Sequence, residues 1–232
     1  MGTYNDVMAG IEKLRNNGIN VIPSTVITPS FPELNVIVEH FIKLGFKDVY
    51  FNLARGKNKI TGFSIDSINE LIVSIKVIYE EIFLDFKENK ISDKLIILRN
   101  SIIFAYLRNI YYKNYVTNRC KWGKSLVIDS NGNFYHCDST IGYEKYYMGH
   151  YKDGKSLNKL QKIPNILKSK ECKMCYAKFL CGGTCYAEKI MGNKRNENIE
   201  CYFQKGLINE NLHLYALLYK NSLLESFIKE LS

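Results

Sequence analysis

Hydrophobic positions in the first thirty residues change from helical spacing to the pattern of a strand. Val7, Ile11 and Leu14 recur on one face of a helix. The run Asn-Asn-Gly at 16–18 is typical of a helix end, because these residues tolerate positive φ angles. The β-prone run INVIPSTVIT (19–28) follows directly. We therefore predict a helix that ends near this turn and a strand after it.

The same alternation recurs further along the chain. A helical apolar face over 34–42 ends at Gly45, and DVYFNLA (48–54) has the composition of a second strand. A polar loop leads to a third predicted helix over 66–86. The order helix, strand, helix, strand, helix is typical of βα units with a parallel sheet. Because two parallel strands alone cannot cover their apolar faces, the first half has the pattern of part of a larger α/β domain or barrel.

The second half has shorter elements. Residues 95–112 are apolar at helical spacing and predict one connecting helix. The segment KSLVIDSNGNFYHC (124–137) predicts a β-hairpin, because Asn-Gly at 131–132 supplies the positive φ angles of a tight turn. Apolar residues in helical phase predict a C-terminal helix over about 209–231.

Composition places the chain among globular proteins. Of its 232 residues, 46% are hydrophobic, which is enough to build a core. No run approaches the roughly 18 apolar residues of a membrane span, and the start MGTYNDVMAG lacks the features of a signal peptide. We therefore expect no membrane association and a cytoplasmic location.

The net charge of +9 is concentrated in the second half of the chain. Thirteen basic and 12 acidic residues precede position 111, whereas 19 basic and 11 acidic residues follow. The lysines are scattered singly, without a basic run interleaved with aromatic residues, which disfavours nucleic acid as a partner. The positive excess suits an acidic peptide, or an anionic centre bound within the protein.

Seven cysteines suggest the chemistry of the second half. Four of them lie in CKMCYAKFLCGGTC (172–185). An odd count in a reducing compartment argues against a disulfide framework and favours metal ligation. Two-residue spacing lets neighbouring thiolates bind one metal centre from a tight turn, and Gly182-Gly183 leaves room for backbone amides to approach inorganic sulfide.

Zinc is the alternative to an iron-sulfur centre. One zinc site would use four thiolates and leave three, whereas two zinc sites need eight ligands, of which His136 would be the eighth. Adjacent residues of a strand point to opposite faces, so His136 would turn away from the metal bound by Cys137. The spacing therefore favours iron-sulfur clusters, with zinc as the remaining possibility.

The complete cysteine pattern resembles a known family signature. The string CX11GX4C from Cys120 to Cys137, then CX2CX5CX3C from Cys172 to Cys185, and a last Cys201, is similar to the SPASM domain of radical S-adenosylmethionine (SAM) enzymes. The segment GTYNDVMAGIEKLRNNGINVIPSTVIT (2–28) resembles the middle of a radical SAM partial barrel.

The resemblance implies an α/β fold class with two parts. Residues 1–112 would form an incomplete radical SAM partial (β/α) barrel, made of its last βα units, and a connecting helix. Residues 113–232 would form a small cysteine-rich α+β SPASM domain with a β-hairpin and a C-terminal helix.

The resemblance further implies two 4Fe-4S clusters with interleaved ligands. The first cluster would be held by Cys120, Cys137 and Cys185, and the second by Cys172, Cys175, Cys181 and Cys201. The first cluster then has one iron open to water, a non-cysteine ligand or a substrate group. Some relatives carry an eighth cysteine a few residues after the first one, and Leu126 occupies that neighbourhood here.

The SAM-cleaving motif CxxxCxxC does not occur in this sequence. SAM and a third 4Fe-4S cluster are therefore expected only if a missing N-terminal half is supplied, and the chain alone is expected to be inactive. No catalytic residue is assigned.

The family implies post-translational modification of a peptide or protein, such as thioether cross-linking or formylglycine-type oxidation. Implied partners are that substrate, a chain with the N-terminal half-barrel, and an electron donor such as ferredoxin or flavodoxin. The alternatives are a stand-alone iron-sulfur electron-transfer or binding module, and a zinc-binding protein.

Four further residues are weaker candidates for function. Arg55 directly follows the second predicted strand, where loops of a barrel carry function, although a solvated arginine is the simpler interpretation. Trp122, beside Cys120, is a candidate to shield a cluster from water. Tyr176 and Phe179 are expected to pack around the cysteine-rich turn.

Overall fold

The computed structural model describes residues 3–56, 60–120, 126–153 and 169–232. The chain divides into two compact units. The first unit comprises Met1–Arg108 with Glu210–Ser232, and the second comprises Asn109–Asn209. The first division falls close to the boundary expected after residue 112. The last 23 residues belong with the N-terminal residues, however, and not with the cysteine-rich unit.

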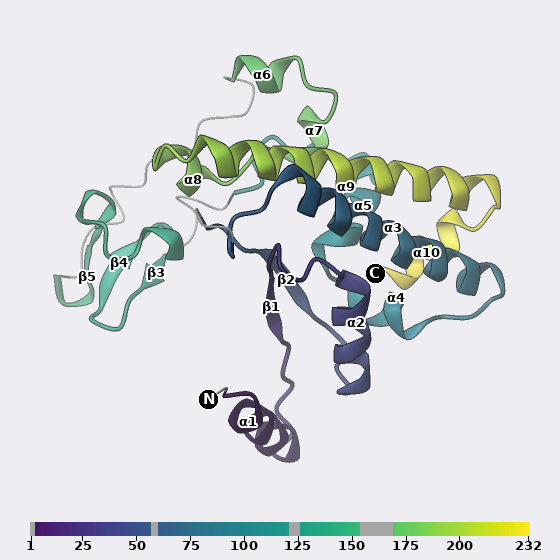
Figure 1. Ribbon diagram of the computed structural model, residues 1–232, viewed down its shortest axis with the longest axis horizontal. Coiled ribbons are helices and arrows are strands. Elements are labelled where there is room, and N and C mark those ends of the chain that lie inside the picture. Colours follow the sequence, from purple (N-terminus) through teal and green to yellow (C-terminus); the bar gives the residue numbers. More distant parts are fainter. Residues whose placement is uncertain (1–2, 57–59, 121–125, 154–168) are drawn as a thin grey trace. The chain divides into compact units, whose positions relative to one another are not determined.

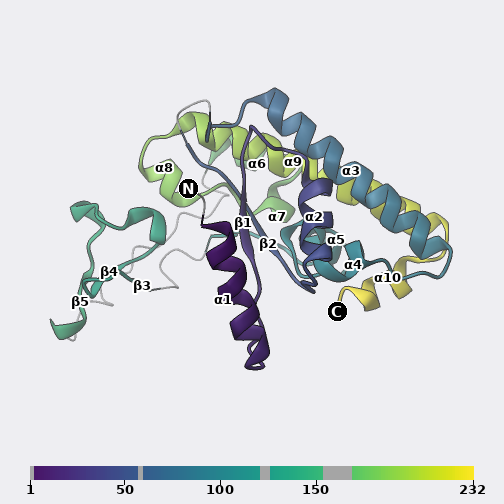
Figure 2. The ribbon, with the colours of Figure 1, turned by 60° about the horizontal axis from the view of Figure 1, so that its bottom comes forward.

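The first unit contains a parallel pair of strands (Figure 1). Strand β1 (Ser24–Ile27) pairs with β2 (Tyr50–Leu53), with Ser24 opposite Tyr50 and Ile27 opposite Leu53. This confirms the parallel pairing that the order of elements predicts. Strand β1 is shorter than the β-prone run 19–28. Pro23 interrupts this run, because proline has no backbone N–H to donate. The two strands run side by side in Figure 2 as well.

Three helices accompany this sheet, as the sequence predicts. They are α1 (Tyr4–Asn16), α2 (Leu34–Lys43) and α3 (Ile65–Lys87). Glycines in the left-handed region follow the first two, with φ of 73° at Gly18 and 75° at Gly45. Helix α3 is the longest of the three and buries an apolar stripe, formed by Ile68, Leu71, Ile75, Ile78, Tyr79, Ile82 and Phe86.

The predicted connecting helix over 95–112 is wrong as a single element. The structure has α4 (Asp93–Leu98), the short 3-10 helix η1 (Ile102–Phe104) and α5 (Ala105–Tyr111). Ser101 interrupts the helix, because its hydroxyl donates to the Leu98 carbonyl (2.7 Å) and accepts from the Ile103 amide (3.3 Å).

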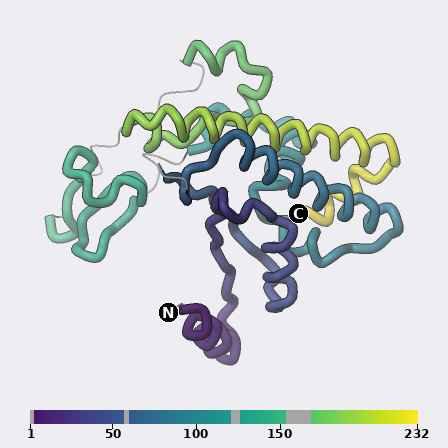
Figure 3. The backbone as a smooth tube through the Cα atoms, viewed as in Figure 1, coloured from purple at the N-terminus to yellow at the C-terminus, as the bar shows by residue number. Residues whose placement is uncertain are grey.

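The C-terminal helix also differs from its prediction. Helix α9 (Lys194–Lys220) begins several turns before the predicted start, and Ser222, with φ of 58°, separates it from α10 (Leu224–Glu230). Residues 210–220 of α9 lie along α3 in both views (Figures 1 and 2). The tube in Figure 3 shows the chain then turning back towards α3 and α4. There the Phe227 ring lies 5.0 Å from the Phe86 ring.

The second unit contains a three-stranded antiparallel sheet in the order β3-β4-β5. Strands β3 (Val127–Ile128) and β4 (Asn133–Tyr135) form the predicted hairpin. Its turn has φ of 87° at Gly132, and Asp129 Oδ1 accepts from the Asn131 and Asn133 amides. Strand β5 (Gly149–His150) was not predicted, because two residues carry no periodicity.

Short helical turns make up much of the rest of the second unit. The 3-10 turns are η2 (Asp138–Thr140), η3 (Glu144–Tyr146) and η4 (Tyr151–Asp153). The short α-helices are α6 (Lys170–Lys173), α7 (Lys178–Cys181) and α8 (Tyr186–Ile190). None of the helices in the described ranges combines the length and apolar character that a bilayer span requires.

Candidate metal centre

The seven cysteines lie on different elements of the second unit, and all are free thiols of intermediate exposure. Cys120 follows α5, and Cys137 follows β4. Cys172 lies in α6, three residues before Cys175. Cys181 ends α7, Cys185 directly precedes α8, and Cys201 lies in the N-terminal part of α9.

Cys120, Cys137 and Cys185 share one apolar cluster. They pack with Tyr186, Ile190 and Met191 against the buried residues Tyr146 and Ala187. Up to 65 positions of sequence separate these three cysteines. They are the three cysteines that the family resemblance assigns to the first cluster.

The other four cysteines lie close enough for their negative charges to raise one another's pKa. Cys201 interacts with Cys172 and with Cys175, and Cys181 interacts with Cys201. Cys201 is thus the common neighbour of the three thiols of the 172–181 segment. These are the four cysteines that the resemblance assigns to the second cluster.

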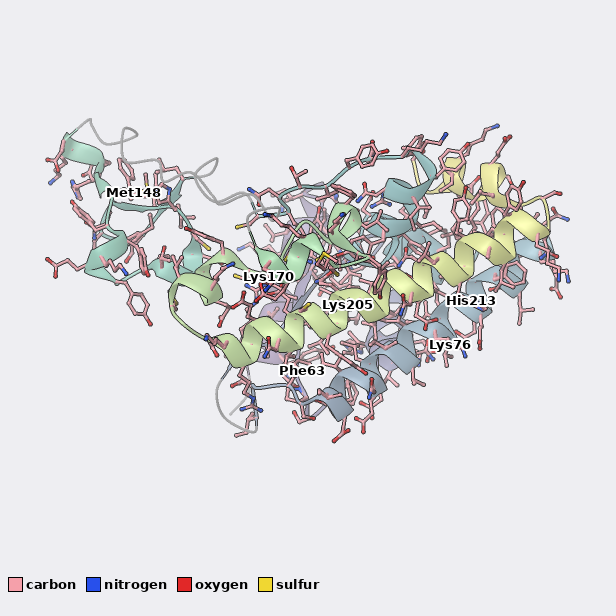
Figure 4. All side chains as sticks on the ribbon, turned by 90° about the horizontal axis from the view of Figure 1, so that it is seen from above. Phe63, Lys76, Met148, Lys170, Lys205 and His213 are labelled. Atoms are coloured by element: carbon pink, nitrogen blue, oxygen red, sulfur yellow. The ribbon has the colours of Figure 1, made fainter. Side chains whose placement is uncertain are left out.

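Burial raises the pKa of three of the thiols, Cys137, Cys181 and Cys201. At Cys201 the ammonium group of Lys205 opposes this rise in pKa, and Figure 4 shows Lys205 on α9, one turn after the cysteine. Burial therefore favours the protonated form of these three thiols, and a bound metal cation would favour their thiolates.

The backbone turns tightly between Cys172 and Cys175. Ser169 caps α6 by accepting from the Cys172 amide (3.4 Å), and the Cys175 amide donates to the Cys172 carbonyl (3.2 Å). A further turn follows, because the Lys178 amide donates to the Cys175 carbonyl (3.2 Å). This local structure carries two thiols on one short segment, as the two-residue spacing predicts.

Gly182 allows α7 to end against a neighbouring segment. It has φ of 67°, and its carbonyl accepts from the Arg119 amide (3.0 Å). A Cβ atom at this position would lie 2.5 Å from Val116 Cγ1 and 2.8 Å from the Arg119 backbone nitrogen. Only glycine accommodates both the backbone conformation and this close approach. The approach brings Cys181 next to residues 116–119, which directly precede Cys120.

The arrangement is not the closed shell of a single ion. Among the described residues, no group of three or more His, Cys, Asp or Glu side chains could hold a metal ion. Tetrahedral zinc needs ligands that converge on one point. In a 4Fe-4S cube each thiolate binds a different iron, so its ligands do not have to converge on one point. His136, the candidate eighth zinc ligand, is buried beside Cys137 and joins no such group within the described ranges.

The remaining candidates have different outcomes. Tyr176 is 63% exposed and donates to Asn209 Oδ1 (3.0 Å), so the expectation that it packs around the cysteine-rich turn is wrong. Phe179, also partly exposed, meets the Tyr115 ring edge-on at 5.8 Å. Arg55 lies two residues after the end of β2 and pairs with Gly62 in an isolated bridge. Trp122 lies outside the described residues.

Sequence reasoning missed two functional candidates. Glu200 forms an ion pair with Arg119 and also accepts a hydrogen bond from the Cys185 amide (2.9 Å). The sequence could have pointed to both residues through their places beside cysteines, because Arg119 directly precedes Cys120 and Glu200 directly precedes Cys201. Their contact across 81 positions is a tertiary feature.

No family model and no curated protein matches the chain. Several solved structures are similar. Native anSMEcpe with bound AdoMet has a TM-score of 0.65 at 17% identity, covering 96% of this chain and 62% of that one. Native anSMEcpe with bound AdoMet and Cp18Cys peptide has a TM-score of 0.64 at 17% identity, covering 96% and 63%. The complex with AdoMet and Kp18Cys peptide has a TM-score of 0.57 at 18% identity, covering 92% and 63%.

The chain thus spans less than two thirds of the length of these proteins. At this level of identity the similarity establishes a shared fold over nearly the whole chain. The mixed helix and strand fold of this protein is similar to the fold of the anSMEcpe structures.

Proposed function

We propose that this chain is the C-terminal portion of a radical SAM/SPASM maturase and binds two auxiliary 4Fe-4S clusters. The observation that supports the proposal is that Cys120, Cys137 and Cys185 pack against one apolar cluster, while Cys201 lies near the other three thiols. The fold shared with anSMEcpe supports it. The clusters would serve in the post-translational modification of a peptide or protein.

The residues of the chain would bind and shield the clusters. Cys172, Cys175, Cys181 and Cys201 would hold one cluster completely. Cys120, Cys137 and Cys185 would hold the other and leave one iron for another ligand, with Tyr146 and Ala187 limiting access of water from the apolar side. When bound, such clusters supply one-electron transfer and, at an open iron, a coordination site for a substrate group.

The SAM-dependent step would require further βα units. The sheet formed by the described residues of the first unit has two strands, and every residue of α1 is at least partly exposed. Val7 on α1 and Val26 on β1 are more than half exposed. We propose that a partner chain adds strands here and supplies the CxxxCxxC loop that binds SAM and a third 4Fe-4S cluster.

The substrate would be a peptide or a peptide segment of a protein. Solved anSMEcpe structures hold AdoMet with the Cp18Cys or Kp18Cys peptide. The basic excess after position 110 suits a peptide with acidic residues. The modification would be of the thioether cross-linking or formylglycine-oxidation type. An external donor such as ferredoxin or flavodoxin would exchange electrons with the clusters.

Anaerobic reconstitution with iron and sulfide tests cluster binding. We expect about eight irons per chain and the visible absorbance of 4Fe-4S clusters. Cys201→Ser should lower the iron content to about four, because it removes the common neighbour of the second group. Met174→Ser is the matched control, since Met174 lies between Cys172 and Cys175 and is 86% exposed. A chain that binds two zinc ions and shows no cluster absorbance would contradict the proposal.

A further inference from the structure

A charged pair lies between the segments that carry the two groups of cysteines. Glu200 is 8% exposed, and both of its carboxylate oxygens have partners. Oε1 pairs with Nη2 of Arg119, and Oε2 accepts from the Cys185 amide at 2.9 Å. The side chain of Arg119 is 27% exposed, so the pair is largely withdrawn from water.

Each partner is adjacent in sequence to a cysteine of one group and hydrogen-bonded to a segment that carries a cysteine of the other group. Arg119 precedes Cys120 of the first group, and its amide donates to the carbonyl of Gly182, the neighbour of Cys181 in the second group. Glu200 precedes Cys201 of the second group, and it binds the backbone of Cys185 in the first group. The ion pair and these two backbone contacts therefore connect three segments, which carry Cys120, Cys181 with Cys185, and Cys201.

Stabilisation of the fold does not by itself explain why a charged pair, Arg119 with Glu200, lies in this partly buried place. Withdrawing an ion pair from water costs about as much free energy as the attraction between its charges returns, and well-packed apolar residues often stabilise a fold equally well. The two charges lie beside the cysteines, however. Arg119 directly precedes Cys120, and the Glu200 carboxylate accepts a hydrogen bond from the Cys185 amide (2.9 Å).

We propose that Arg119 and Glu200 are positioning residues that hold the Cys185 turn between the two cluster sites and set the reduction potential of the bound clusters. The proposal rests on the proposed function for its second part only. The positive charge of Arg119 stabilises the reduced, more negative form of a nearby cluster. The negative charge of Glu200 has the opposite effect.

Hydrogen exchange of the metal-free, reduced full chain tests the positioning. Glu200→Ala and Arg119→Ala should each speed amide exchange in residues 183–188 severalfold. The first variant removes the hydrogen-bond acceptor of the Cys185 amide, and the second removes the ion-pair partner of that acceptor. Glu200→Gln should exchange almost as slowly as the unmodified chain, because its amide oxygen still accepts from Cys185. Unchanged exchange in both alanine variants would overturn the positioning role, whether or not clusters bind.

Potentiometric titration of the reconstituted chain, followed by electron paramagnetic resonance, tests the electrostatic role. Arg119→Gln should lower the cluster potentials, Glu200→Gln should raise them, and Arg119→Lys should restore values close to those of the unmodified chain. Lys90→Gln is the control, because it removes one positive charge from the exposed Asp85 pair of the other unit. Shifts of equal sign in the two glutamine variants, or none, would overturn this role.

The two measurements separate this inference from the proposed function. If the unmodified chain takes up no iron, cluster binding and the electrostatic role both fail, and hydrogen exchange still decides the positioning. If the chain takes up about eight irons and the two glutamine variants retain the potentials of the unmodified chain, the electrostatic role alone fails.

Discussion

Gly182 is the residue at which local conformation and long-range packing meet. Its left-handed backbone ends α7, and its missing side chain leaves space for Val116 and for the Arg119 backbone. Both requirements act on the segment that carries Cys181. From the sequence, glycine at this position was expected to leave room for backbone amides to approach sulfide. The structure shows a second reason for a glycine here, which is its close contact with Val116 and Arg119.

Replacing Gly182 with alanine should disturb the cysteine-rich unit. We expect the variant to lose about 3 kcal/mol of unfolding free energy, from left-handed strain and from displacement of the Arg119 backbone. Urea unfolding measures the loss, and the iron content after reconstitution should fall in parallel. Gly192→Ala is the control, because Gly192 has φ of 73° and a Cβ added there would have no atom within 4 Å, so it should lose about 1 kcal/mol. Equal losses would show that the close approach is unimportant.

Asn211 is the central polar residue of the first unit. It is fully buried, its Oδ1 accepts from the Leu107 amide (2.9 Å), and its Nδ2 donates to Tyr79 Oη (3.0 Å) and to the Ile103 carbonyl (2.9 Å). Burial also raises the pKa of Tyr79 well above its usual range. The tyrosine therefore stays neutral and donates to the Ile103 carbonyl.

Asn211→Ala should destabilise the first unit by about 3 kcal/mol, because it leaves the buried Leu107 amide without its acceptor. Chemical denaturation measures the change. Asn221→Ala is the matched control, since the Asn221 side chain is exposed and donates to the Leu217 carbonyl within its own helix end. That change should stay within about 0.5 kcal/mol. A loss below about 1 kcal/mol for Asn211→Ala would contradict the importance of these hydrogen bonds.

At the scale of the elements, one lysine connects the helices α2, α3 and α4 through its hydrogen bonds. Lys94 Nζ donates to Glu81 Oε2 (2.6 Å), to Asn35 Oδ1 (2.6 Å) and to Glu39 Oε1 (3.1 Å). Lys94, Glu81 and Glu39 line part of an open cavity of about 580 Å³. Burial lowers the pKa of Lys94, but the hydrogen bonds to Glu81 and Glu39 outweigh it, so the pKa is raised above its ordinary value of 10.5.

The contribution of Lys94 to stability should therefore depend on pH. Because the pKa is higher in the folded state, the stabilisation is complete below about pH 10.5 and is lost as pH rises through the folded pKa. Lys94→Met should lower the unfolding free energy by about 2 kcal/mol at about pH 8. The difference should shrink as pH rises above 10.5.

The matched control for Lys94 is Lys76→Met. Lys76 pairs with Glu80 at 3.8 Å on the exposed face of α3, and both side chains are about half exposed. Its removal should change the unfolding free energy by less than about 0.5 kcal/mol. Urea unfolding at several pH values measures both variants. A loss at Lys94 that does not vary between about pH 8 and about pH 11 would contradict the electrostatic explanation.

Element types follow from the sequence more closely than element ends do. The helices α1, α2 and α3 and the β3-β4 hairpin agree with their periodicity and turn residues. The break at Ser101 and the separation of α9 from α10 at Ser222 were missed. At both sites a serine interrupts an apolar pattern that continues on each side, so periodicity alone does not reveal the break.

At the scale of the whole molecule, the last 23 residues return to the first unit. Leu214, Leu218, Phe227 and Ile228 are at most 2% exposed and complete the core that α3 begins. The first 112 residues, which the sequence suggested as a domain, therefore lack part of their own core.

A chain that ends at Asn209 should lose the fold of the first unit. Removing these side chains takes away several buried apolar groups, each worth about 2 kcal/mol, which together exceed half of a typical domain's stability. Hydrogen exchange should show loss of protection in α3, while residues 169–190 stay protected in the reconstituted protein. A shortened chain that keeps α3 protected without residues 210–232 would contradict this view of the first unit.

The sequence by itself determined the helix and strand types, the parallel order of the first half and the identity of the cysteines, because periodicity, turn chemistry and spacing are local properties. The resemblance added the expectation of sets of three and four thiols, and their ligation of clusters stays a prediction. Only the tertiary structure decided the contact of Arg119 with Glu200, the return of residues 210–232 and the position of Asn211. Such contacts join residues far apart in sequence, and they depend on the path of the whole chain, which no local pattern specifies.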